Sequence, residues 1–424
     1  MAGQVSIIRG NALELPLADS TVDLVVTSPP YFGLRSYQDG GEHYDGQIGA
    51  EATPTEFVDA LIAATREMVR VLKPSGSIWV NLGDKYAGSA AGGTQNGAAT
   101  LGRKVASVRT AKGVMPKTDV RPKSLIGIPW RYAIRCIDEL GLILRAEVIW
   151  SKPNGLPESV TDRVRRSHEQ WFHFTVEPRY YSAVDEIREA HAARTIEQSK
   201  IDARAGLVKK SGHRNAVTEN CRERSVTPPP NPLGKLPGSV WTIATEPLHV
   251  PDHLGIDHFA AFPTELPRRI ITGWSPREVC SACGEGRRPV VTRGASFLSA
   301  HPMPHPNDPD GDLRKQRAKG QKHQDWKNAH PDHITGYACD CPEPTAPTTP
   351  GVVLDPFGGT GTTALAASVL GRDAISVDMS ADYCRLAEWR TSDPKQRAKA
   401  ARVEFDATTA PMSGQASLFD LEAS

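Results

Sequence analysis

The pattern of apolar and polar residues alternates between short apolar runs and amphipathic segments, which is typical of an α/β protein. Short apolar runs bounded by turn residues predict strands, and apolar residues at helical spacing predict helices. The helix predicted over 56–71 is expected to end at Lys73-Pro74-Ser75-Gly76, which are turn residues. The predicted strands are 5–8, 22–26, 77–82, 142–150, 171–175 and 374–377, and a second amphipathic helix is predicted over 125–140.

An unusual sequence, Thr27-Ser28-Pro29-Pro30-Tyr31, follows the strand predicted at 22–26. The prolines stiffen the turn, and Tyr31 offers a flat apolar face. The Ser28 hydroxyl and the Pro29 carbonyl are two acceptors that can converge on one small donor, such as the exocyclic amino group of a base stacked on Tyr31. Accepting both amino protons frees the nitrogen lone pair from the ring, so this turn predicts activation of an amino group as a nucleophile.

A second chemical segment lies near the other end of the chain. Residues 351–363 predict a buried strand, a tight glycine turn and a helix start, where an anionic group is favoured. The strand at 374–377 ends in Asp378, an acid suited to ribose hydroxyls. Gly359 to Ala364 also fit the nicotinamide fingerprint G-x-G-x-x-A. Too few residues follow it for a doubly wound sheet, so the other strands must come from the N-terminal half.

Together, Ser-Pro-Pro-Tyr and Asp-Pro-Phe-Gly-Gly-Thr-Gly-Thr-Thr resemble the paired motifs of the amino-group DNA methyltransferases, which use S-adenosylmethionine. The order of the motifs, catalytic first, is that of the beta class, and the resemblance covers most of residues 4–390. It implies a Rossmann-like S-adenosylmethionine-dependent fold, with a mixed seven-stranded sheet in permuted motif order. It also implies methyl transfer to the amino nitrogen of a base flipped out of double-stranded DNA. Carbon-5 methylation needs a Pro-Cys thiolate, and the sequence has no Pro-Cys.

The resemblance also assigns the site residues. Ser28, Pro29, Pro30 and Tyr31 are the predicted catalytic residues. Residues 259–271 resemble the family's helix that folds back onto the cofactor, and Asp355 is expected to orient the methionine end of the cofactor or to buttress the turn. Asn11 departs from the family's usual Gly-Asp, whose acid contacts the adenine. The predicted cofactor-binding residues are Asn11, Phe262, Pro263, Asp355, Phe357, Gly358, Gly359, Gly361, Thr362, Thr363 and Asp378.

The target base is predicted from the first position of the catalytic motif. In the family, serine there is associated mainly with cytosine N4, whereas Asp or Asn is typical of adenine N6. Ser28 therefore favours cytosine. Adenine N6 stays open as the alternative, because both targets present the same amino geometry.

Four cysteines predict a structural zinc site. Cys280-x-x-Cys283 and Cys339-x-Cys341 each resemble a zinc knuckle, and the polar segment between them is unlikely to fold unaided. In a reducing compartment such thiols bind metal more often than they form disulfides. Histidines of the same segment are alternative ligands. Cys136 and Cys384 are expected to be core residues of helices.

These assignments divide the chain into consecutive regions. The predicted organisation is a catalytic half at 1–184 with a mobile loop at 87–117, a target-recognition region at 185–250, a cofactor-site helix at 251–279, a zinc-knuckle-like insertion at 280–345, an S-adenosylmethionine-binding half at 346–392 and a flexible tail at 393–424.

Charge and short motifs predict the partners. The net charge of +1 conceals a basic segment at 200–240, which is expected to contact phosphates, although a solvated loop is the alternative. In the tail, Gln415, Leu418 and Phe419 resemble the peptide by which bacterial proteins dock on the DNA sliding clamp. A cognate restriction endonuclease is a further candidate partner.

One other interpretation of the whole chain remains beside the enzyme. The knuckles, basic segment and tail also fit a non-catalytic zinc-containing DNA-binding regulator with a degenerate methyltransferase core. The intact catalytic and glycine motifs argue against it. With no apolar run of about eighteen residues and no charged-then-apolar leader, we expect no membrane span and a cytoplasmic location, with nucleoid association through DNA.

Overall fold

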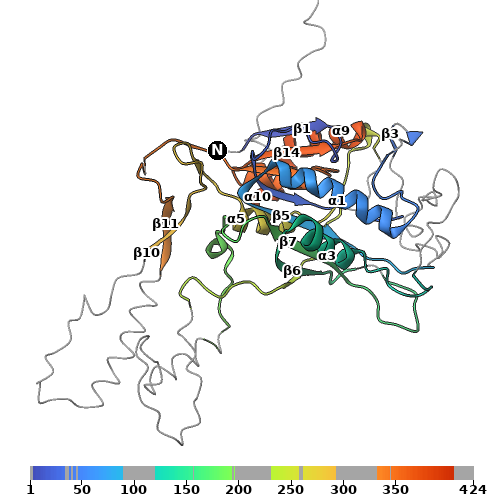
Figure 1. Cartoon of the computed structure of the whole chain (residues 1–424). Helices are drawn as coiled ribbons and strands as arrows, with labels where there is room; N and C mark the ends of the chain where they lie inside the picture. Colours follow the sequence, from blue (N-terminus) through green and yellow to red (C-terminus); the bar gives the residue numbers. More distant parts are fainter. Residues whose placement is uncertain are drawn as a thin grey trace, which may run out of the picture. The chain divides into compact units, whose positions relative to one another are not determined.

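A computed structural model describes most of the chain, and its described residues form two compact units (Figure 1). Unit 1 comprises Met1–Tyr181, Ser239–Arg277 and Pro350–Ser424, and unit 2 comprises Ser182–Gly238 and Glu278–Thr349. The described residues are 3–33, 38–39, 42–43, 46–88, 120–155, 157–192, 195, 231–256, 261–292, 332–343 and 345–404.

Unit 1 is built on a mixed eight-stranded sheet of order β1-β14-β13-β2-β5-β7-β6-β8. β7 runs antiparallel to both neighbours, and the other pairs are parallel. The strands are β1 (Val5–Arg9), β2 (Val22–Thr27), β5 (Leu72–Leu82), β6 (Ile143–Ser151), β7 (His168–Thr175), β8 (Val240–Thr242), β13 (Val352–Asp355) and β14 (Asp373–Asp378).

The C-terminal strands β13 and β14 lie between the N-terminal strands β1 and β2. This is the permuted order predicted from the sequence, in which the N-terminal half supplies the remaining strands. The sheet has one strand more than expected, because β8 from the predicted recognition region adds to the edge beyond β6.

One face of the sheet is covered by α1 (Pro54–Val71) and α3 (Ile128–Leu140), which lie side by side (Figure 1). A capping box begins α1: Glu56 N–H donates to Thr53 Oγ1, and Thr53 N–H donates to Glu56 Oε2. The side chains of Ile78 and Val80 belong to the core on this face. Alternate residues of a strand point to opposite faces, so Trp79 belongs to the other face.

The opposite face carries α5 (Glu265–Trp274), α8 (Thr362–Val369), α9 (Ala381–Ser392) and α10 (Pro394–Ala401). Here the Trp79 ring stacks on His173, with 4.5 Å between centroids, and contacts Trp274 of α5. Burial lowers the pKa of His173 to about 3, so its imidazole is neutral and accepts or donates one hydrogen bond with Ser77 Oγ at 3.0 Å. This aromatic cluster is therefore part of the hydrophobic core, and His173 has a structural role in it.

Two predicted boundaries are wrong. Lys73–Gly76 do not form a separate loop after the first helix, because β5 begins at Leu72 directly after α1. Their turn chemistry instead produces an irregularity in the pairing with β2, where the register shifts between Val22 and Leu24. The helix predicted from Phe259 begins only at Glu265, after Pro263. Phe259 itself lies outside the described residues.

Unit 2 contains two small antiparallel pairs, β9 (Val279–Cys280) with β12 (Thr348–Thr349) and β10 (Arg288–Thr292) with β11 (His333–Ala338). It also holds a 3-10 turn at Val184–Ile187, and a further turn at Asp252–Leu254 belongs to unit 1. A short hairpin, β3 (Gln38–Asp39) and β4 (Glu42–His43), completes the described elements.

Several predicted segments fall partly outside the described residues: 89–117 of the loop at 87–117, most of the basic segment, and 405–424 of the tail. The tail region begins with a helix, because the Asp393 side chain accepts from Gln396 N–H and caps α10. Within the described residues, no helix is long and apolar enough to cross a membrane.

Asp23 offers a test of how the two halves of the sequence are joined. This buried residue of β2 accepts from Val352 N–H of β13 and from Lys73 Nζ of β5, both at 2.8 Å. Because Asp23→Ala orphans a backbone N–H and a half-buried ammonium, we expect it to lower the free energy of unfolding by about 2–4 kcal/mol. Urea unfolding measures the loss.

Asp19→Ala is the matched control for Asp23→Ala. Asp19 pairs with Arg70 at the surface, so its removal is expected to cost less than about 1 kcal/mol. If both variants lowered the free energy of unfolding by the same small amount, Asp23 would not have a role in joining the two halves of the sequence.

Candidate active site

The predicted catalytic and cofactor segments meet at one edge of the sheet. β13, β14, β1, β2 and β5 are parallel, so their carboxyl ends lie together. Thr27, the last residue of β2, donates its hydroxyl to Asp355 Oδ1 at 2.6 Å, although 328 positions separate them in sequence. Thr363 of the glycine segment donates to the Val26 carbonyl at 3.2 Å. Two hydrogen bonds therefore join the two motifs.

Ser28 is oriented by Asn81 at the end of β5. The Ser28 hydroxyl donates to Asn81 Oδ1 at 3.2 Å, and the Asn81 amide nitrogen donates to the Gln170 carbonyl at 3.1 Å. The second bond fixes which end of the amide faces Ser28. Because the single proton of Ser28 is donated to Asn81, the lone pairs on its oxygen remain available to accept from an incoming group.

Tyr31 is held by its hydroxyl. That oxygen lies 2.9 Å from Asn81 Oδ1 and 2.8 Å from Glu169 Oε2. Glu169 forms an ion pair with Lys152, whose ammonium lies over the Trp150 ring, 4.1 Å from its centroid. A charge-assisted network therefore fixes the aromatic plane that follows the two prolines.

The Tyr31 ring also lies directly against the backbone of Gly83. A Cβ added at Gly83 would lie 2.7 Å from Tyr31 Cε2, closer than real Cβ contacts. Glycine is thus required there as long as the ring keeps its hydroxyl contacts. The ring is fixed at both its edge and its tip.

The glycine turn after β13 is held by Asp378. Gly359 N–H donates to Asp378 Oδ2 and Ser380 N–H to Asp378 Oδ1, each at 2.9 Å. Gly358 N–H donates to the Val377 carbonyl at 2.9 Å, and a Cβ added at Gly358 would lie 1.9 Å from Ser376 Oγ. The turn therefore runs in contact with β14, where only glycine fits.

Asp355 is buried behind this turn. Its Oδ1 accepts from the Thr27 hydroxyl and, at 3.1 Å, from Phe357 N–H. Burial raises the pKa of the Asp355 carboxyl to about 6, while hydrogen bonds from Thr27 and others oppose the shift. Of the two predicted roles, these contacts favour buttressing of the turn.

The remaining predicted cofactor residues lie around the same edge. Asn11 follows Gly10, whose N–H donates to the Asp378 carbonyl at 2.9 Å, and Asn11 Oδ1 accepts from Leu13 N–H at 3.0 Å. Phe262 packs edge-on against Trp171 of β7, with 5.8 Å between centroids. After it, Thr264 N–H donates to Glu246 Oε2 at 3.0 Å.

A family model described as DNA methylase, covering N6 and N4 enzymes, matches residues 22–279 and 346–389. The chain belongs to this DNA methylase family. It is 34% identical over 270 residues to the type II methyltransferase M.Cfr9I of Citrobacter freundii, which covers 63% of this chain and 71% of that protein. It is 39% identical over 187 residues to the type II methyltransferase M.SmaI of Serratia marcescens, covering 43% and 60%.

Among solved structures, a PvuII DNA methyltransferase, cytosine-N4-specific, aligns over 95% of this chain and 93% of that chain. The sequence identity is 17% and the TM-score is 0.48.

Membership confirms the resemblance seen in the sequence. The DNA methylase is an S-adenosylmethionine-dependent enzyme that methylates amino groups in DNA, as expected. The nicotinamide interpretation of the glycine turn is therefore wrong. The sheet order, with the cofactor strands inserted between the N-terminal strands, is the permuted Rossmann-like arrangement predicted.

Four residues of the DNA methylase site were not predicted: Asn81, Gly83, Lys152 and Glu169. Asn81 and Gly83 lie at the end of a predicted strand, where function was to be expected. Lys152 begins the stretch 152–168 that resembles downstream motifs of the family, but nothing in the sequence pairs it with Glu169.

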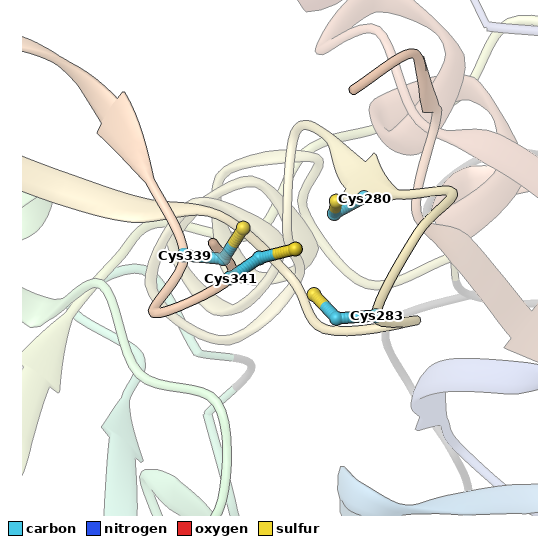
Figure 2. Close-up of side chains that lie close together, drawn as sticks. All are labelled: Cys280, Cys283, Cys339 and Cys341. Atoms are coloured by element: carbon cyan, nitrogen blue, oxygen red, sulfur yellow. The ribbon is translucent and has the colours of Figure 1, made fainter. Parts of the chain in front are cut away.

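The four predicted zinc ligands lie together in unit 2 of the DNA methylase (Figure 2). Their Sγ atoms all lie within 4.8 Å of one another. Cys280 ends β9, and Cys339 follows β11. Hydrogen bonds from the backbone N–H groups of Cys283 and Ala282 lower the pKa of the Cys280 thiol to about 7, whereas burial and the neighbouring thiols raise the pKa of Cys283 to about 12. Cys136 and Cys384 are buried in helices, as expected.

Gly83→Ala tests the fixed position of Tyr31. The added methyl group pushes the ring off Asn81 and Glu169, so we expect methyl transfer to fall about 100-fold with cofactor affinity unchanged. Transfer of labelled methyl groups to DNA and calorimetric titration of cofactor measure the two quantities.

Gly155→Ala is the control for Gly83→Ala, because a Cβ there meets nothing closer than 3.5 Å. If Gly83→Ala transferred methyl groups to DNA at the wild-type rate, methyl transfer would not depend on the position of the Tyr31 ring.

Proposed function

We propose that the protein is a site-specific methyltransferase that transfers the methyl group of S-adenosylmethionine to the N4 nitrogen of a cytosine flipped out of double-stranded DNA. The observation that carries the proposal is the Ser28–Asn81 hydrogen bond, which turns a serine hydroxyl into an oriented acceptor. Serine at this position favours cytosine through the family resemblance, and adenine N6 is the alternative.

In the proposed mechanism, Tyr31 stacks on the extruded base, and its tethered hydroxyl fixes the plane of stacking. Ser28 Oγ and the Pro29 carbonyl each accept one amino proton, and Pro30 keeps the turn rigid. With both protons held, the nitrogen lone pair points away from the ring system. S-adenosylmethionine, when bound, would supply an electrophilic methyl group on its sulfonium: the N–C bond would form as the S–C bond breaks, S-adenosylhomocysteine would leave, and one amino proton would pass to water.

The residues of the glycine turn fit this cofactor. The backbone at Gly359 leaves room for close approach, since a Cβ added there would meet only the Phe357 carbonyl oxygen at 3.8 Å, and the α8 N-terminus favours a carboxylate. The two Asp378 oxygens accept from the Gly359 and Ser380 N–H groups, and a carboxylate at the tip of this strand suits ribose hydroxyls. We assign the adenine contact to Asn11, the support of the turn to Asp355, and the cofactor cradle to Phe262, Pro263, Phe357, Gly358, Gly359, Gly361, Thr362 and Thr363.

Nucleoside mass spectrometry of DNA from cells that express the protein tests the choice of base. We expect N4-methylcytosine above the background of cells that express Ser28→Ala, because this variant loses one of the two acceptors. N6-methyladenine instead would leave the mechanism standing and overturn the cytosine assignment. If neither methylated base were found, the result would favour the non-catalytic DNA-binding regulator.

We also propose that Cys280, Cys283, Cys339 and Cys341 bind a structural zinc ion. Four thiolates in tetrahedral geometry at about 2.3 Å from the metal require sulfur atoms about as close as these. Such an ion would join β9 to the end of β11, and so would close the insertion at 280–345.

Elemental analysis of the purified protein tests the zinc site. We expect one zinc per chain in the wild type and a loss of most of it in Cys339→Ser, because three thiolates hold zinc more weakly than four. Cys136→Ala, a buried helix residue outside the cluster, is the control and should keep its zinc. A zinc-free wild type, prepared without chelators, would contradict the site.

Three further assignments stay predictions from the sequence. Docking on a sliding clamp through Gln415, Leu418 and Phe419 concerns residues outside the described part of the chain. A cognate restriction endonuclease is proposed on the family resemblance, and a cytoplasmic location, nucleoid-associated through DNA, on the hydrophobicity pattern of the sequence.

A further inference from the structure

A buried arginine of α9, Arg390, lies directly behind the glycine turn. Its side chain is almost fully buried, and its Nη1 donates to Thr362 Oγ1 at 2.6 Å and to Thr360 Oγ1 at 2.7 Å. One helical turn earlier, Ala387 packs on Gly361: a Cβ added at Gly361 would lie 2.9 Å from Ala387 Cβ. Helix α9 therefore supports the turn through a close backbone contact and a cation.

The charge of Arg390 is not neutralised by an ion pair. Burying a guanidinium is costly unless an anion compensates it. Across the described part of the chain, no carboxylate lies within ion-pair distance of Arg390, and its Nε has no hydrogen-bond partner. Glu246 acts on it through space, but Glu246 already pairs with Lys399 and accepts from Thr264 N–H. Burial lowers the pKa of Arg390 only to about 10, so it stays charged at neutral pH.

The contacts of Arg390 also decide what the two threonine hydroxyls can do. Because Nη1 donates to both oxygens, each hydroxyl uses a lone pair on Arg390 and keeps its proton. The two oxygens lie 3.2 Å apart, so a bond between them uses at most one of the two protons. At least one hydroxyl proton is left to donate to another group.

The start of α8 adds to this positive potential. Its N-cap is Gly361, in the left-handed conformation with φ of 72°, and no side chain caps the helix. The first backbone N–H groups of a helix carry a partial positive charge. The buried cation, a free hydroxyl proton and an uncapped helix start thus come together at one turn, and all three favour an anion.

We propose that Arg390 is a positioning residue for the carboxylate at the methionine end of the cofactor, and that it acts by orienting the Thr360 and Thr362 hydroxyls as donors and by placing a positive charge behind the turn. The inference rests on the proposed assignment of this turn to S-adenosylmethionine. The carboxylate is the anion of that cofactor, whereas its amino and sulfonium groups are cations. The arrangement therefore fixes which end of the methionine portion lies at α8.

A pair of ligands that differ only in the carboxylate tests the proposal. S-adenosylhomocysteine and its decarboxylated analogue are titrated calorimetrically into the wild type and into Arg390→Met. We expect the wild type to bind the carboxylate form more tightly. In Arg390→Met its affinity should fall about 10- to 100-fold, since a charge-assisted contact is lost. The affinity of Arg390→Met for the decarboxylated analogue should fall less than about threefold. The ratio of the affinity for S-adenosylhomocysteine to that for its decarboxylated analogue is therefore smaller in the variant than in the wild type.

Arg372→Met is the matched control. Arg372 is equally buried, but it donates to the carbonyls of Leu370 and Ser275 at 2.7 and 2.8 Å, away from the turn. This variant should be less stable without any change in the ratio. If Arg390→Met does not fold, Thr362→Val tests the same ratio while leaving the charge in place.

The outcomes separate this inference from the assignment on which it rests. Equal losses for both ligands would show that Arg390 supports the turn only structurally, and an unchanged ratio in both Arg390→Met and Thr362→Val would overturn the proposal. A wild type that binds neither ligand would instead overturn the assignment of the turn to the cofactor, and the inference with it.

Discussion

The hydrogen bond from Thr27 to Asp355 is the contact on which the active site depends. It joins residues 328 positions apart in the sequence, at the end of β2 and the end of β13, and it is buried. Because β13 pairs with β2 in parallel, the two chemical motifs leave the sheet at the same edge. The proposed roles of Ser28, as an acceptor of amino protons, and of the glycine turn, as the cofactor site, require the two motifs to be adjacent. The permuted sheet makes them so.

The same edge shows how a weak acceptor can be given direction. A serine hydroxyl rotates freely, and its proton is as able to repel an amino group as its lone pairs are to attract one. Asn81 removes this ambiguity, because its amide is itself fixed by the Gln170 carbonyl. The Tyr31 hydroxyl lies within hydrogen-bond distance of the same Asn81 oxygen and of Glu169, and it can donate its one proton to either. Acceptor and stacking plane are thus oriented by one small network before any base arrives, which is the preorganisation that catalysis needs.

The sequence was sufficient to predict the strands, the two motifs and their order, and the two cysteine pairs. Each strand, motif and cysteine pair is defined by residues close together in the chain. It was insufficient for Asn81 and Glu169, whose roles arise only when β5 and β7 pair. Local chemistry also misled at Lys73–Gly76, where turn residues were absorbed as an irregularity within β5 because pairing with β2 resumes at Ser77. Arg390 shows the same limit: the pattern of α9 marks it as one more helix residue, and only packing against the turn gives it a role.

The central claim is that Ser28 acts on the target amino group and not on the cofactor. Its most direct test is the single-turnover rate of methyl transfer to DNA by Ser28→Ala preloaded with S-adenosylmethionine, beside the dissociation constant of that cofactor. We expect a rate at least about 100-fold below wild type with an unchanged dissociation constant. A wild-type rate, or a loss that follows weaker cofactor binding alone, would contradict it.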